Sequence, residues 1–140
     1  MTFKRYELPC VILVGGLAYM GLETVWRGYS HWSMGICGGL CFLFIYLFEI
    51  TKSTSPLPIK CLFGALVITA AEFCTGVLVN IVFDWRVWDY SDRFLNLFGQ
   101  VCPAFSMLWF FLSVPAFFIA KIIRTKIFMP IPKNESEEKA

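Results

Sequence analysis

Residues 61–83 read CLFGALVITAAEFCTGVLVNIVF and contain one charged side chain, that of Glu72. An α-helix needs about 20 apolar residues to cross the hydrocarbon core of a bilayer. This stretch is therefore long enough to span a membrane. Three other stretches are similarly apolar, and the four predicted spans run from Pro9 to Trp26, Trp32 to Phe48, Cys61 to Phe83 and Phe94 to Ala120.

The composition of the whole chain supports the same class. Apolar residues make up 58% of the 140 residues and charged residues 16%, and the mean hydropathy is +0.67. Soluble domains average about 45–50% apolar and about 25% charged residues, so a water-soluble globular protein is excluded. The net charge is only +2 and the basic residues form no stripe along the sequence, which excludes a nucleic-acid-binding module. Aromatic residues make up 18% of the chain, which is too many for a disordered protein. We predict an all-α polytopic membrane protein of the cell membrane.

The basic residues predict how the chain is oriented. Lysine and arginine are retained on the cytoplasmic side of membrane spans. With four spans, three of the 12 basic residues, Arg27, Arg86 and Arg93, lie on the side opposite the termini. Both termini are therefore expected to be cytoplasmic. We expect residues 1–120 to form a single four-helix transmembrane domain and residues 121–140 a cytoplasmic tail, basic first and acidic last.

The four spans have the pattern of two repeated hairpins. In the first hairpin Glu23 precedes the Trp-Arg pair at 26–27, and in the second Glu72 precedes the Trp-Arg pair at 85–86. Internal repeats often place a functional site at the interface between them. The alternative is that the similarity is a coincidence of composition.

Polar side chains inside the spans are the first candidates for a site. A charged residue at the bilayer centre costs about 2.5–3.5 kcal/mol on insertion scales unless it is paired or hydrated. Tyr19, Glu23 and Arg27 are spaced four apart and line one helix face, and Glu72 and Asn80 share a face of the third span. These faces are expected to turn inward, and Glu23 is expected to pair with Arg27.

Glu72 is the strongest single candidate because no basic residue lies within two turns of it on its own helix. It could be protonated, hydrogen-bonded to asparagine or glutamine, paired with an arginine from another segment, or bound to a cation. Asn96 and Gln100, also four apart, are placed on a face of the fourth span. Pro103 is then expected to kink or reset that helix.

Residues 84–93, DWRVWDYSDR, connect the third and fourth spans and are unusually rich in charged and aromatic side chains. They form either a plain extracellular loop or a segment that closes a polar cavity, which membrane depth permits only under protein cover. Trp88, Asp89 and Tyr90 are candidate site residues. Asp89 is expected to cap the following helix or to bind Arg27. Tryptophans at this end form either an interfacial belt or an aromatic entrance for a ligand.

Other motifs argue against catalysis. The six cysteines are scattered without a Cys-x-x-Cys pair, and His31 is the one histidine, so we expect no metal site and no cofactor. The chain has no phosphate-binding loop, serine nucleophile elbow or zinc-protease motif. An enzyme is therefore not expected, although a membrane-embedded one is kept as a third class. Gly35 and Gly39 form a small-xxx-small pair that favours helix packing.

Two stretches carry a resemblance to a known family. They are GLETVWRG at 21–28 with HWSM at 31–34, and WDYS at 88–91 continuing through Asn96 and Gly99-Gln100 to Trp109. Both resemble the putative ABC-transporter type IV (CmpB-like) family of small bacterial membrane proteins, with similarity from about Gly15 to Ala120. The resemblance implies a compact multi-helix membrane protein. If the permease name of the family holds, it also implies an ABC-type ATPase partner.

Together these observations predict a small transporter or permease component. Glu23 and Glu72 are expected to face a polar cavity, to which Asn80, Asn96 and Gln100 add hydrogen bonds. The chain is expected to lie in the lipid bilayer. Because four spans offer little interior, we also expect a homodimer or an ABC-type ATPase partner. No nucleic-acid partner is expected. The alternative function is a non-transporting membrane partner or regulatory subunit, whose carboxylates only hold the helices together.

Overall fold

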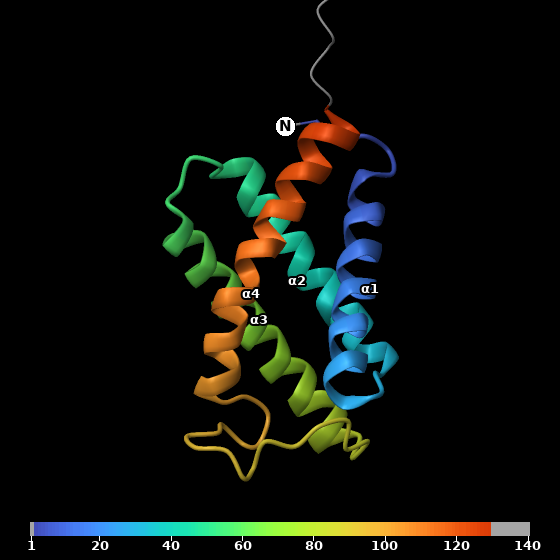
Figure 1. Cartoon of the computed structure of the whole chain (residues 1–140). Helices are drawn as coiled ribbons and strands as arrows, with labels where there is room; N and C mark the ends of the chain where they lie inside the picture. Colours follow the sequence, from blue (N-terminus) through green and yellow to red (C-terminus); the bar gives the residue numbers. More distant parts are fainter. Residues whose placement is uncertain (1, 130–140) are drawn as a thin grey trace, which may run out of the picture.

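The chain folds into four long helices in the computed structural model, which describes residues 2–129. The helices are α1 (Glu7–Arg27), α2 (Trp32–Thr51), α3 (Leu57–Gly76) and α4 (Pro103–Ile122) (Figure 1). α3 and α4 continue into π-helical turns, η1 (Val77–Val82) and η2 (Ile123–Phe128). All four helical segments are long and apolar enough to cross a bilayer. The predicted all-α fold with four spans is confirmed.

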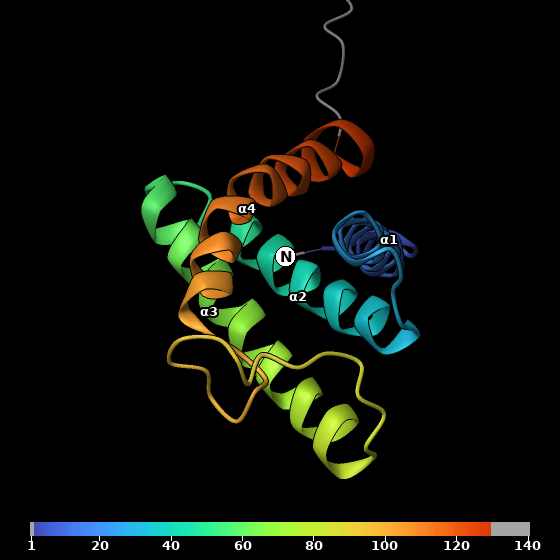
Figure 2. The same ribbon diagram turned by 60° about the horizontal axis from the view of Figure 1, so that its bottom comes forward.

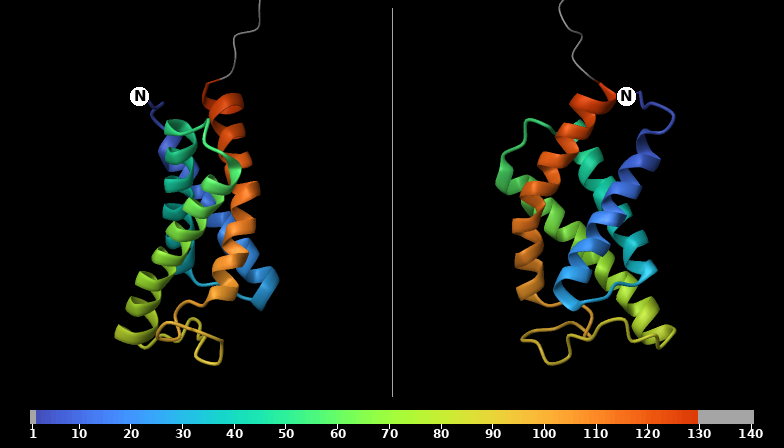
Figure 3. Two further views of the ribbon diagram at one scale, coloured as in Figure 1. Left: turned by 90° about the vertical axis from the view of Figure 1, so that its left-hand side faces the viewer. Right: turned by 45° about the vertical axis from the view of Figure 1, so that its right-hand side comes forward.

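The helices run alternately in opposite directions along one bundle (Figures 1 and 3). The start of α1, the connection at residues 52–56 and the end of η2 lie at one end, which we call the terminus end. The short connection at residues 28–31 and the long loop at residues 83–102 lie at the other, the loop end. This arrangement is the one expected for an even number of spans.

Glycines allow α1 and α2 to approach closely. A Cβ atom on Gly16 would lie 2.7 Å from the carbonyl oxygen of Gly35, and one on Gly39 would lie 2.7 Å from that of Ile12. Backbone atoms cannot move aside as a flexible side chain can, so any larger residue would force the helices apart. Small residues favour such contacts in lipid, where apolar burial supplies no force between helices. The packing role predicted for Gly35 and Gly39 is confirmed.

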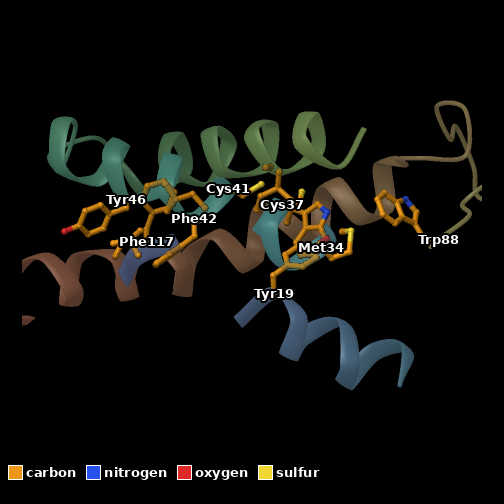
Figure 4. Close-up of a cluster of buried hydrophobic side chains, with 14 of the residues drawn as sticks. Tyr19, Met34, Cys37, Cys41, Phe42, Tyr46, Trp88 and Phe117 are labelled. Carbon is orange, nitrogen blue, oxygen red and sulfur yellow. The ribbon is translucent and has the colours of Figure 1, made fainter. Parts of the chain in front are cut away.

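One continuous core runs along the bundle. It extends from Tyr46, near the terminus end, through Phe42 and Cys37 to Trp88 in the long loop (Figure 4). Tyr46 is fully buried and Trp88 is 6% exposed. The core therefore ties the long loop to the helices and fixes what lies beneath it.

The fourth helix differs from its prediction. The apolar run from Phe94 was expected to be helical, but α4 begins at Pro103 and its helical course continues to Phe128. Proline fits the first turn of a helix because its missing N–H would have no partner there. Pro103 therefore starts the helix and does not kink it. Asn96 and Gln100 lie in the loop and share no helix face, so that prediction was wrong.

Two buried ion pairs at the terminus end were not predicted. Glu7 is fully buried and accepts hydrogen bonds from Arg124 of η2 and Tyr46 of α2. The Lys60 ammonium lies 2.6 Å from the Glu49 carboxylate. Both glutamates lie just outside the predicted spans, and the helices include them because partners on neighbouring helices neutralise the charges. The part of the tail predicted to be acidic lies outside the described residues.

Candidate functional site

Arg27, the last residue of α1, connects that helix to the long loop. Its guanidinium lies 3.9 Å from the Glu23 carboxylate, which confirms the expected pair. It also donates hydrogen bonds to the Tyr90 hydroxyl at 3.0 Å and to the Val87 carbonyl at 3.4 Å. Burial raises the pKa of Tyr90 above its usual range, so the phenol stays neutral. A cation at a helix C-terminus is also favoured by the helix dipole.

Glu23 has one carboxylate oxygen without a partner. The residue is 8% exposed, and no group among residues 2–129 donates a hydrogen bond to Oε2. A buried polar atom left unpaired costs about 1–3 kcal/mol. Such atoms are rare in folded proteins and call for a specific explanation. Glu23 therefore has an acceptor that a ligand or water could satisfy.

Two cavities meet at the Glu23–Arg27 pair. The pair cavity, about 190 Å³, lies between α1 and α4 and is lined by both members of the pair and by Tyr90. The loop cavity, about 260 Å³, is lined by Arg27 together with loop residues that include Trp88, Asp89 and Tyr90. The structure thus brings together five of the nine predicted site residues: Glu23, Arg27, Trp88, Asp89 and Tyr90.

Asn80, in η1, and Gln100, near the end of the long loop, hold the loop in place through hydrogen bonds. The Asn80 carbonyl oxygen accepts hydrogen bonds from the backbone N–H groups of Val87 at 2.7 Å and Trp88 at 3.4 Å. Its amide nitrogen donates to the Gln100 side chain at 2.8 Å. The Trp88 indole donates to the Gln100 carbonyl at 2.9 Å. Asn80 and Gln100 line neither cavity, so they position the residues that do.

Asn96 and Asp89 make turns within the loop. The Asn96 side chain accepts from the Gly99 N–H at 2.9 Å and donates to the Arg93 carbonyl at 2.8 Å. Asp89 accepts from the N–H of Ser91 at 2.8 Å and from its hydroxyl, and these hydrogen bonds lower the pKa of Asp89. Asp89 was expected to cap the following helix or to bind Arg27. It does neither, because its carboxylate accepts from Ser91 instead.

Glu72 lies in a separate place between three helices. One carboxylate oxygen accepts from the Tyr19 hydroxyl of α1, and the other accepts from the Trp109 indole of α4 at 2.9 Å. The two rings stack with their centroids 5.5 Å apart. Among the described residues, the asparagine, glutamine and arginine partners expected for Glu72 are not used. The residue also lines neither cavity at the pair. Sequence reasoning missed these partners, although the Tyr19 hydroxyl and the Trp109 indole N–H are hydrogen-bond donors inside apolar spans.

The tryptophans of the loop end divide between the two expected roles. Trp32 and Trp85 lie 5.8 Å apart, are 60% and 45% exposed, and pack with His31. Their exposure fits an interfacial belt. Trp26 and Trp88 line the loop cavity. The interfacial belt and the aromatic entrance for a ligand both stay predictions.

Four apolar helices and buried carboxylates between them define a small polytopic membrane protein. The chain belongs to the putative ABC-transporter type IV family, whose model (ABC_trans_CmpB) matches residues 22–137. The resemblance predicted from sequence is confirmed. A comparison with curated proteins gave no match, and a comparison with solved structures gave none either.

Proposed function

We propose that the protein is a transporter or permease component of the cell membrane. The observation that carries the proposal is the unpartnered Glu23 oxygen at the pair cavity, beside the positive charge of Arg27. An ionisable group kept at membrane depth is costly, and such groups mark substrate and ion pathways. The family name, which refers to ABC transporters, supports the same class.

In this proposal the residues have distinct roles. Glu23 and Arg27 bind the substrate, Trp88, Asp89 and Tyr90 cover it, and Asn80, Asn96 and Gln100 keep the loop in place. The contact of Glu72 with Tyr19 and Trp109 closes the path toward the terminus end. Passage across the membrane then requires that this contact separate, because it joins α1, α3 and α4.

The small size of the bundle implies a partner. We propose a homodimer or an ABC-type ATPase encoded as a separate chain, since four helices enclose little interior. The proposed orientation places the terminus end in the cytoplasm, because seven of the ten basic residues among residues 2–129 lie at that end. An ATPase would then bind at the terminus end.

A second candidate function is a non-transporting membrane partner or regulatory subunit. The observation in its favour is that both oxygens of Glu72 are bonded to side chains of other helices. That carboxylate serves packing alone under this alternative. The two candidates differ in what Glu23 does, because a packing role needs no unpartnered oxygen.

Glu23→Gln is expected to reduce transport about tenfold or more while the protein still inserts and folds. The change replaces the carboxylate that carries the unpartnered oxygen with a neutral amide. The loss of a hydrogen bond to a charged group corresponds to about a tenfold or larger change in affinity. Untargeted mass spectrometry of cells and medium would compare strains making the wild type, Glu23→Gln, or no protein. We expect at least one solute to be redistributed by the wild type alone.

The matched control for this experiment is Ala70→Leu, a change at an exposed position of α3 that lines neither cavity. It should redistribute the same solute as the wild type at equal membrane abundance. A Glu23→Gln strain that matches the wild type, or a wild type that matches the empty strain, would reject transport at this pair.

A further inference from the structure

A third cavity, here called the lateral groove, lies between α1 and α4. Its volume is about 420 Å³, within the range of roughly 300–1,000 Å³ that small-molecule sites occupy. α1 contributes Ala18 and Leu22, and α4 contributes Ala116 and Ile119. α2 lies between these two helices and closes the bottom of the groove (Figure 2). Because Ala18, Leu22 and Ile119 are exposed, the groove opens toward the lipid.

The lateral groove adjoins the pair cavity, and the pair cavity adjoins the loop cavity. It shares Leu22 and Trp109 with the pair cavity, which in turn shares Arg27 and Tyr90 with the loop cavity. The path is apolar at the middle of the helices and becomes charged at the loop end. This gradient has the polarity of an amphiphile that lies parallel to the helices, with its chain toward the bilayer centre and its head at the surface.

Glu23, whose Oε2 is buried and unpartnered, lies where the apolar and charged parts of this path meet. The residue lines the pair cavity and is 8% exposed, and Oε2 has no hydrogen-bond partner among the described residues. A ligand with a hydroxyl at this level would supply the missing donor. The oxygen therefore indicates the junction between the chain and the head of the ligand.

We propose that the lateral groove, the pair cavity and the loop cavity form one binding site for a single-chain amphiphile with a hydroxyl group at its chain–head junction. The hydrocarbon chain lies in the groove, the hydroxyl donates to Glu23 Oε2, and the polar head occupies the loop cavity. The inference rests on the proposed function only in making this amphiphile the transported substrate. Its binding can be tested without transport.

The physics of the bilayer makes the head decisive for selectivity. A chain that moves from lipid into an apolar groove exchanges one apolar environment for another and gains little. Discrimination therefore comes from the hydroxyl at Glu23 and from the charged loop cavity, whose lining includes Arg27, Arg93, Asp89 and Asp92. A helix of a second copy would cover the groove but would bring no polar head into the loop cavity.

The test uses the full chain in nanodiscs and a monoacylglycerol with a photoreactive diazirine at the end of its chain. A methyl ester with the same chain and diazirine but no hydroxyl is the matched probe. We expect saturable labelling of residues 14–22 and 112–119 by the monoacylglycerol, and about tenfold weaker labelling by the ester. Equal labelling by both probes, or labelling spread evenly over all four helices, would reject the site.

Ala18→Leu should fill the groove and reduce monoacylglycerol labelling about tenfold, whereas Ala70→Leu, on the exposed face of α3, should leave it unchanged. Gly21→Leu is a second groove variant, because a Cβ at Gly21 meets no atom within 4 Å. Undiminished labelling in a folded groove variant, or a chain-to-chain cross-link across the groove, would overturn the proposal. Labelling that persists in a protein without transport would reject the transport proposal alone.

Discussion

Arg124→Met is expected to lower the free energy of unfolding by about 3–5 kcal/mol, which is typical when one partner of a buried ion pair is removed. The change leaves the Glu7 carboxylate fully buried without its cation, with Tyr46 and a backbone N–H of Lys4 as its remaining donors. It also separates η2 from the start of α1. Unfolding of the purified protein by added SDS, followed by circular dichroism in detergent, would measure the loss.

Lys126→Met is the matched control, because Lys126 is an exposed basic residue of the same helical turn. It should change the free energy of unfolding by less than about 0.5 kcal/mol. Adding Glu7→Gln to Arg124→Met should recover part of the stability, since the uncompensated charge is then gone. If Arg124→Met were as stable as Lys126→Met, the ion pair would not hold the terminus end together.

Glu72→Leu should be the second most damaging change. It leaves the Tyr19 hydroxyl and the Trp109 indole N–H without an acceptor in an apolar interior. Hydrogen bonds between membrane helices are worth about 0.6 kcal/mol on average and up to about 1.7. Two of them together predict a loss of about 1–3 kcal/mol, measured by the same SDS titration.

Tyr19→Phe removes one of these hydrogen bonds and should cost about half as much as Glu72→Leu. Cys74→Leu, at an exposed position of α3, is the control and should be close to neutral. A Glu72→Leu protein as stable as the wild type would show that this carboxylate does not join the helices. In that case the path would have no seal at this level.

The spans could be predicted because membrane helices are specified by length and hydropathy within each segment. The Glu23–Arg27 pair and the packing role of Gly35 and Gly39 could be predicted for the same reason, because each depends on residues spaced four apart on one helix. The partners of Glu72 could not be found in this way, because they come from α1 and α4, far away in sequence. Glu7 and Arg124 are likewise brought together only by the fold.

The loop was the hardest part to predict. Residues 94–102 are as apolar as a span, yet Leu95 and Phe98 have φ values of 52° and 53°, which a helix does not contain. Such conformations are strained for these residues and persist only where surrounding contacts fix them. Here the Gln100 side chain donates to the Phe98 carbonyl at 2.8 Å, and the Asn96 side chain bonds to backbone groups of Arg93 and Gly99 on either side of these residues. Hydropathy alone cannot distinguish an apolar loop from a helix.

The proposal that this chain transports is tested most directly by asking from which sides the pair cavity can be reached. A single cysteine at Leu108, which lines that cavity on α4, would be introduced into a variant whose six native cysteines are replaced by alanine. A membrane-impermeant thiol reagent is then added to intact cells and to inverted membrane vesicles. Cysteines at Phe94, in the loop, and at Ser53, between α2 and α3, are the one-sided controls.

Leu108→Cys is expected to react from both sides, while Phe94→Cys reacts only in intact cells and Ser53→Cys only in inverted vesicles. Access from both sides is what distinguishes a transport pathway from a pocket in a partner subunit. Reaction of Leu108→Cys in intact cells alone, with both controls behaving as expected, would contradict the transport proposal.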